Sequence, residues 1–274
     1  MGITLYTAPD CIRCRIVKAY LHDKNMPYDT VDFKEDAQAF NTFYRANRKS
    51  IYRNPEGVEF PLFDDGTAIK QGSGEVTAYL LSGHEMECCV TRSDMLHGKI
   101  SGLYPSQCPD SQDDNFVTLV QYLSNGGLEV WLQSDGRKPA LLKRLLEIKN
   151  VHVILNLVGG AELAAALLGG APTKEELAES LNLVLGTSDG MVRFLAMPKE
   201  KDGAYVWAEP ADAQAAAKMA ADAYGKPTMP FAVMAATKEM PLDLHGLEPV
   251  TDQQMLAYRS AIRRHLFKAD IVKN

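Results

Sequence analysis

The sequence predicts an α/β protein with two domains, the first small and mixed, the second built from repeated strand–helix units. The chain has 274 residues, more than a single domain usually holds. Residues 1–83 give the pattern β-α-β-α-β-β-α, whereas from residue 99 a strand followed by a helix recurs five times. Repeated units of this kind form parallel sheets. We therefore expect a first domain over 1–83, a connector over 84–98, and an incomplete (β/α) barrel or open parallel sheet over 99–274.

The elements of the first domain follow from hydrophobic periodicity and from turn residues. "ITLY" alternates as a strand does, and apolar residues from Ile16 to Leu21 then fall at helical spacing. Asn25 and Pro27 end that helix. The turn "DDG" joins two further strands, and Gly83 ends the closing helix. After the first helix we expect strands over 28–33, 59–63 and 68–70, and helices over 35–47 and 74–83.

The second domain alternates short apolar runs with longer helical patterns. Thr173 with Glu176, and Thr251 with Gln254, have the spacing of capping boxes, which mark helix starts. Five strands are expected, each followed by a helix. The strands cover 99–104, 128–132, 151–158, 191–197 and 230–236, and the helices 113–124, 139–147, 161–168, 211–225 and 252–272.

Composition excludes several classes of protein. The formal net charge of -6 argues against a nucleic-acid-binding protein, which usually presents a basic surface. No run of about 18 apolar residues is present, and the N-terminus lacks the basic and apolar regions of a secretory signal. We therefore expect a cytoplasmic protein without membrane contact. In that compartment its five cysteines are expected to be reduced, catalytic or metal-binding.

Cys11 and Cys14 form a CxxC motif between a strand and a helix. A cysteine at a helix start gains from the positive end of the helix dipole, which favours the nucleophilic thiolate. Arg13 and Arg15 add positive charge, and Cys14 would resolve a mixed disulfide. No second CxxC completes a four-cysteine zinc site, and two buried structural thiols are the remaining alternative. The position of the motif favours a redox pair.

Residues 1–83 resemble the glutaredoxins, and the opening "ITLYTAPDCIRCRIVKAYLHDKNMPYDTVDF" is most similar to small glutaredoxin-like electron donors of ribonucleotide reductase. The resemblance implies a thioredoxin fold and a cis-proline at Pro61, with Gln71, Gly72 and Ser73 offering N–H groups to a glutathione carboxylate. The sequence departs from the family in having Ile-Arg between the cysteines instead of Pro-Tyr. From the motif and the resemblance together, we expect catalysis by Cys11 and Cys14 and substrate binding by Arg13, Phe60, Pro61, Gln71, Gly72 and Ser73.

The remaining cysteines suggest weaker hypotheses. Cys88 and Cys89 are adjacent, and a metal site or an auxiliary thiol relay would fit their surroundings. Cys108 lies in a βα loop, where open α/β sheets carry their sites, and would fit a substrate thiol for Cys11. We assign no metal ligands. The potential ligands near Cys88 are His84, Glu85, Glu87 and His97.

Residues 99–270 resemble, more faintly, the later part of a radical S-adenosylmethionine barrel of the activating-enzyme type. "ISGLYP" over 100–105 and "LQSDG" over 132–136 stand at the positions of the family's characteristic strand ends. The cluster-binding CxxxCxxC is absent, and Leu103-Tyr104 replaces the family's Gly-Glu. The resemblance therefore implies a half-barrel scaffold that has lost radical chemistry.

Taken together, these patterns predict a glutaredoxin-like dithiol–disulfide oxidoreductase whose C-terminal domain recognises the substrate or partner. Its substrate would be a protein disulfide or glutathione, and its reductant thioredoxin reductase. We expect no cofactor, with glutathione as a co-substrate at most. Two alternatives stay open: a redox-sensing or regulatory binding protein, and a radical-S-adenosylmethionine-like enzyme without its cluster motif.

Overall fold

A computed structural model describes residues 2–54, 57–95 and 98–272. The chain forms two compact units, each drawn from several stretches of sequence. The first unit contains residues 1–103, 108–130 and 148–151, and the second contains 104–107, 131–147 and 152–274. Residues 84–98 thus group with the first unit, as does helix α4, Asp113–Asn125. The domain boundaries expected from the sequence stay a prediction.

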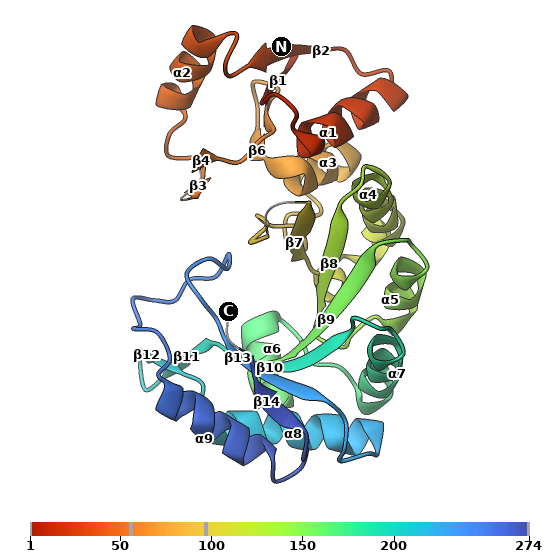
Figure 1. The fold of residues 1–274 in the computed structure, drawn as a ribbon, viewed down its shortest axis with the longest axis vertical. Coiled ribbons are helices and arrows are strands. Elements are labelled where there is room, and N and C mark those ends of the chain that lie inside the picture. The colour runs from red at the N-terminus through yellow and green to blue at the C-terminus, as the bar shows by residue number, and fades with distance from the viewer. Residues whose placement is uncertain (1, 55–56, 96–97, 273–274) are drawn as a thin grey trace. The chain divides into compact units, whose positions relative to one another are not determined.

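The N-terminal sheet has four strands in the order β2-β1-β5-β6. Strand β1 pairs in parallel with β2 and antiparallel with β5, and β5 pairs antiparallel with β6. Helices α1 and α3 pack against each other (Figure 1). This confirms the predicted mixed sheet and its thioredoxin-like element order. The strands are Ile3–Thr7, Tyr28–Asp32, Leu62–Asp64 and Ile69–Gln71, and the helices are α1 Ile12–Asp23, α2 Ala37–Ala46 and α3 Gly72–Ser82.

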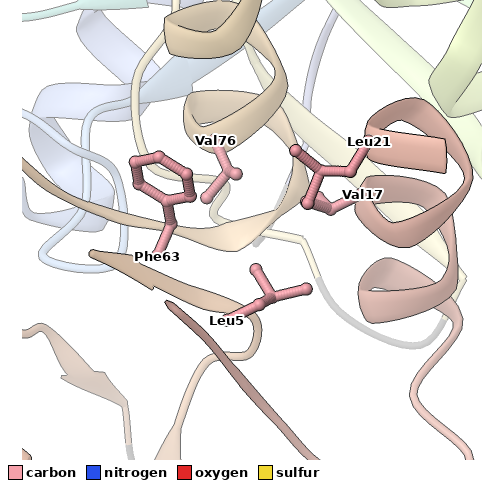
Figure 2. Close-up of a cluster of buried hydrophobic side chains, with 5 residues drawn as sticks. All are labelled: Leu5, Val17, Leu21, Phe63 and Val76. Carbon is pink, nitrogen blue, oxygen red and sulfur yellow. The ribbon is translucent and has the colours of Figure 1, made fainter. Parts of the chain in front are cut away.

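One hydrophobic cluster fixes α1 and α3 on this sheet (Figure 2). Val17 and Leu21 lie one helical turn apart on α1, and Val76 faces them from α3. Leu5 and Phe63 come from neighbouring strands, and all five side chains are at most 1% exposed. Burying a side chain of this size stabilises the fold by about 1.5–3 kcal/mol. The cluster therefore holds α1, whose N-cap residue is Cys11, against β1.

The C-terminal sheet has six strands in the order β14-β13-β10-β9-β8-β7, which is the order of the chain without reversal. Such an order suits a partial barrel, whereas a doubly wound sheet reverses at its first strand. Strand β10 pairs in parallel with β9 and with β13, and β13 pairs in parallel with β14. The strands are β7 Lys99–Leu103, β8 Glu129–Ser134, β9 Val151–Leu157, β10 Met191–Ala196, β13 Phe231–Ala235 and β14 Ala269–Ile271.

Helices follow these strands at the expected places, with both predicted capping boxes formed. Within the described ranges, no helix has the length and apolar character that crossing a membrane requires. The expected cytoplasmic location stays a prediction. The helices are α5 Pro139–Leu146, α6 Ala161–Leu168, α7 Lys174–Leu185, α8 Pro210–Tyr224 and α9 Asp252–Ile262.

Several elements differ from the expectation, among them helix α7, which was not one of the five expected helices although its capping box was expected. The final helix ends at Ile262 instead of continuing to residue 272, because Ala269–Ile271 pairs with β13 as strand β14. The sequence of this segment suits a helix equally well, so its pairing with the distant strand β13 decides that it is a strand. A hairpin of β11 Pro198–Lys201 and β12 Ala204–Trp207 was not predicted, although its Asp-Gly turn is a known hairpin signal. The short pair β3 Arg53–Asn54 and β4 Gly57–Val58 was missed as well.

The turn between β5 and β6 gives the fold an acid-sensitive point. Burial opposes ionisation of Asp65, but hydrogen bonds from Thr67, Ala68 and Tyr79 outweigh it and lower the pKa of this carboxyl from 3.8 to about 2. Because the pKa is lower in the folded state, the ionised carboxylate stabilises the fold when the pH is above the ordinary pKa of the group. We therefore expect the free energy of unfolding to fall as the pH drops from about 4 towards 2. In acid unfolding curves, Asp65→Asn should lose this part of the slope; an unchanged slope would contradict the assignment.

Candidate active site at the Cys11–Cys14 pair

Cys11 is the N-cap residue of α1, between β1 and the helix. Its backbone is extended, with φ -74° and ψ 105°, and its Sγ accepts a hydrogen bond from the backbone N–H of Cys14 at 3.0 Å. The side chain thus lies at the positive end of the helix dipole, next to backbone donors. This is the placement that the sequence predicted, and it stabilises a thiolate on reduction.

Cys11 and Cys14 are joined by a disulfide, and their Cα atoms lie 5.3 Å apart. The two cysteines differ in exposure, because Cys14 is 3% exposed whereas Cys11 is half-buried. An attacking thiolate or an incoming substrate therefore reaches Cys11 more easily than Cys14. The asymmetry suits a nucleophile followed by a resolving thiol.

Arg13, between the two cysteines, points into the protein. Its guanidinium forms an ion pair with Glu59 and donates to the backbone oxygens of Met95 at 2.6 Å and Lys99 at 2.7 Å. The expectation that Arg13 offers charge to the thiolate or to a substrate finds no support in this position. Arg15 is exposed and keeps its charge near the motif.

Glu59 is a residue of the site that the sequence did not predict. Its side chain is 8% exposed, and burial raises its pKa despite the opposing attraction of Arg13 and Arg92. Its place two residues before Pro61, together with an arginine inside the CxxC, was the available signal. The ion pair connects α1 to the segment that leads into the proline.

The Phe60–Pro61 peptide bond is cis, as the resemblance implied. Pro61 is buried, and its carbonyl oxygen accepts from the backbone N–H of Gly72 at 2.8 Å. The ring of Phe60 stacks on Phe33 with centroids 5.2 Å apart and also lies against Phe40. Phe60 is therefore half-buried in an aromatic cluster, and its substrate contact stays a prediction.

The predicted glutathione segment at the start of α3 is occupied by internal contacts. The Gln71 amide donates to the backbone oxygens of Tyr52 and Glu59 and accepts from the Tyr52 N–H at 2.8 Å. The N–H of Gly72 is bonded to Pro61, and Ser73 is 0% exposed. None of these three residues presents the group that was expected to bind a carboxylate in an open position.

Two carboxyl groups lie beside the same segment. A side chain on Gly72, whose φ is +77°, would meet a Glu59 carboxylate oxygen at 2.8 Å. Burial raises the pKa of Glu75, and Glu59 raises it further, while the backbone N–H of Gln71 donates to the Glu75 carboxyl and lowers it. The start of α3 is thus surrounded by the protein's own acidic groups.

Among the described residues, the other cysteines lie apart from further side chains that could complete a metal site. Cys88 is exposed, whereas Cys89 and Cys108 are buried. His84 lies 2.7 Å from Glu87, which also pairs with Lys70. Across residues 2–54, 57–95 and 98–272, no three His, Cys, Asp or Glu side chains are grouped to hold a metal ion. His97, the remaining candidate ligand, lies outside the described residues.

The strand ends that resemble a radical S-adenosylmethionine barrel are bonded to each other. The Ser106 and Ser134 hydroxyls lie 3.0 Å apart, and Ser106 also accepts from the Asp135 N–H at 3.1 Å. Asp135 in turn pairs with Arg137 at 2.6 Å. These contacts order the carboxyl ends of the strands but do not indicate which ligand would bind there. The resemblance to the radical S-adenosylmethionine barrel stays a prediction.

Fold and site together define a thioredoxin-like segment with a dithiol pair at a helix N-terminus. The glutaredoxin family matches residues 3–50, so this segment is glutaredoxin-like. Among solved structures, the chain is similar to the glutaredoxin-like protein NrdH-redoxin from Escherichia coli, with 22% identity, 27% of this chain and 84% of that chain covered, and a TM-score of 0.22. No curated protein matches the chain.

Proposed function

We propose that this protein is a dithiol–disulfide oxidoreductase with Cys11 as the nucleophile. The observation that carries the proposal is the Cys11–Cys14 disulfide at the start of α1, with Cys11 the more exposed residue. The glutaredoxin match over residues 3–50 supports the same chemistry. In the reduced protein, the helix N-terminus would favour the Cys11 thiolate.

The reaction consists of two thiol–disulfide exchanges. The Cys11 thiolate attacks one sulfur of a substrate disulfide, forming a mixed disulfide and releasing one substrate thiolate. The Cys14 thiolate then attacks the Cys11 Sγ, releasing the second substrate thiolate and leaving the Cys11–Cys14 disulfide. Two electrons pass to the substrate. We propose that the C-terminal α/β region contributes to recognition of a protein substrate.

For the reductant, we propose a protein dithiol of the thioredoxin-reductase type instead of glutathione. A glutathione carboxylate at the start of α3 would meet the carboxyl groups of Glu59 and Glu75. A negative charge close to other negative charges is disfavoured, so these carboxylates would weaken binding. The N–H group of Gly72 is also already bonded to Pro61. A dithiol reductant needs no carboxylate site, because it reduces Cys11–Cys14 through its own sulfurs.

The test is the redox state of Cys11 and Cys14 in defined dithiol buffers, measured by differential alkylation and mass spectrometry. We expect a reversible disulfide and fast alkylation of Cys11 at neutral pH. Turnover of a protein disulfide, driven by thioredoxin reductase, then distinguishes an enzyme from a redox sensor. A pair that cycles without turnover would favour the sensor, and thiols that never pair would reject both.

The reductant gives a separate prediction. With the same protein disulfide as substrate, we expect thioredoxin reductase to support turnover at least about tenfold faster than glutathione with glutathione reductase. Glu75→Gln should narrow this difference by removing one acidic group, and Glu87→Gln, an exposed change farther along the chain, should leave it unchanged. Equal rates with both reductants in the unaltered protein would contradict the acidic barrier.

A further inference from the structure

Three of the five cysteines gather in the first unit, outside the Cys11–Cys14 pair. Cys89 is 0% exposed and Cys108 is 4% exposed, whereas Cys88 is exposed. The side chain of Cys89 lies next to those of Cys108 and Cys88, and both neighbours raise the pKa of its thiol. We call these residues, Cys88, Cys89 and Cys108, the second thiol cluster. Cys89 is its central member.

The backbone brings the two chain segments of this cluster together. Val90 forms an antiparallel bridge with Leu103, directly after Cys89 and shortly before Cys108. On the other side of the two cysteines, before Cys89 and after Cys108, the Gln112 amide donates to the carboxylate of Glu85. The contact between Cys89 and Cys108 thus lies between two other contacts that join the same segments. The sulfurs meet because of the fold rather than through one side-chain rotation.

The thiols are also locally oriented. Cys89 Sγ lies 3.3 Å from the backbone oxygen of Met86, and Cys108 Sγ lies 3.5 Å from that of Pro109. The neighbouring sulfur of Cys108, which favours the protonated thiol of Cys89, raises its pKa together with burial. A buried thiol that keeps its proton reacts slowly with outside disulfides. An exchange that starts from solvent must therefore begin at Cys88.

We propose that Cys89 and Cys108 are a second redox pair, which a disulfide compound oxidises through Cys88. None of the steps uses Cys11 or Cys14, so the inference goes beyond the proposed function. Its substrate class is a small or protein-borne disulfide that reaches the exposed Cys88.

The steps balance as thiol–disulfide exchanges. The Cys88 thiolate attacks the disulfide, forms a mixed disulfide and releases the first thiolate. Cys89, on losing its proton to solvent, attacks the Cys88 sulfur and releases the second thiolate. The resulting bond between adjacent cysteines is strained. Cys108 then attacks the Cys89 sulfur, which forms the Cys89–Cys108 disulfide and breaks the Cys88–Cys89 bond. The proton of Cys108 passes to the departing Cys88 thiolate. Two thiols are oxidised and one disulfide is reduced.

The test maps disulfides in the full chain. The reduced protein is mixed with 2-hydroxyethyl disulfide, quenched in acid, alkylated after unfolding and digested without reductant for mass spectrometry. We expect a peptide pair linked through Cys89 and Cys108, in the unaltered protein and equally in Cys11→Ser. If Cys89 and Cys108 are both alkylated while Cys88 alone carries the mixed disulfide, the second pair is overturned.

Variants at exposed Cys88 test where the exchange begins. We expect Cys88→Ser to slow formation of the Cys89–Cys108 link at least about tenfold without changing its final extent. An unchanged rate would overturn the role of Cys88 as the thiol at which the exchange begins. If Cys11→Ser abolishes the link, Cys11 is the oxidant and the independence of the second pair is overturned. Because the Cys11–Cys14 peptides appear in the same digest, failure of either pair is seen separately.

Discussion

Replacing Cys11 by serine should reduce disulfide turnover to the background rate, because the thiolate that begins the exchange is lost. A serine hydroxyl at the start of α1 would fit the same space and accept the same N–H of Cys14, so the fold is expected to persist. Turnover of a protein disulfide, followed with thioredoxin reductase as electron donor, measures the effect. Retained turnover in Cys11→Ser would contradict the assignment of the nucleophile.

The matched change at the buried sulfur has a different outcome. Cys14→Ser keeps the nucleophile but removes the thiol that resolves the mixed disulfide. We expect Cys11 to remain covalently attached to the substrate after a single exchange. Intact-protein mass spectrometry would show the added substrate mass, which reductant removes. Such a trapped species in Cys11→Ser instead of Cys14→Ser would reverse the two roles.

The sequence predicted the local elements of the first unit well, because each depends on nearby residues. The strand before Cys11 and the helix after it follow from alternation and helical spacing within one short stretch of chain. The cis bond before Pro61 came from the resemblance, since spacing gives no sign of it. The last strand, Ala269–Ile271, was missed because only its pairing with β13 distinguishes it from a helix.

The same distinction holds within the candidate site. Cys11 and Cys14 have a sequence separation of 3, so their pairing could be anticipated from sequence. The partners of Arg13 are Glu59 and the backbone at residues 95 and 99, up to 86 positions away. Hydrophobic periodicity along the sequence cannot predict a contact between residues so far apart in the chain. The role of Arg13 therefore changed from a surface charge to a buried link once the fold was known.

Breaking the buried ion pair of Arg13 and Glu59 should strongly destabilise the first unit. Their side chains are 9% and 8% exposed, so removing one partner leaves the charge of the other buried and poorly hydrated. Loss of one member of such a pair costs about 3–5 kcal/mol. Arg13→Met also leaves the carbonyl oxygens of Met95 and Lys99 without its two hydrogen bonds. We expect the unfolding midpoint to shift to a lower urea concentration.

The double variant and the pH dependence identify the cause. Arg13→Met with Glu59→Leu should be less destabilising than the sum of the single changes, because no buried charge remains. In Arg13→Met, burial raises the pKa of Glu59 further, because only the weaker attraction of Arg92 still opposes it. A group whose pKa is raised in the folded state stabilises the fold at low pH, and this stabilisation is lost as the pH rises. The free energy of unfolding of Arg13→Met should therefore be lower at pH 8 than at pH 5.

An exposed ion pair in the same unit supplies the control. Lys99 and Glu129 lie 3.4 Å apart, and both side chains are 48% exposed. Water screens such a pair, so Glu129→Gln should change the free energy of unfolding by less than about 1 kcal/mol. If Arg13→Met and Glu129→Gln shift the urea midpoint equally, the Arg13–Glu59 link does not stabilise the start of α1. A large shift in Arg13→Met but not in Glu129→Gln would instead show that the Arg13–Glu59 pair joins helix α1 to the segment before Pro61 as one cooperative structure.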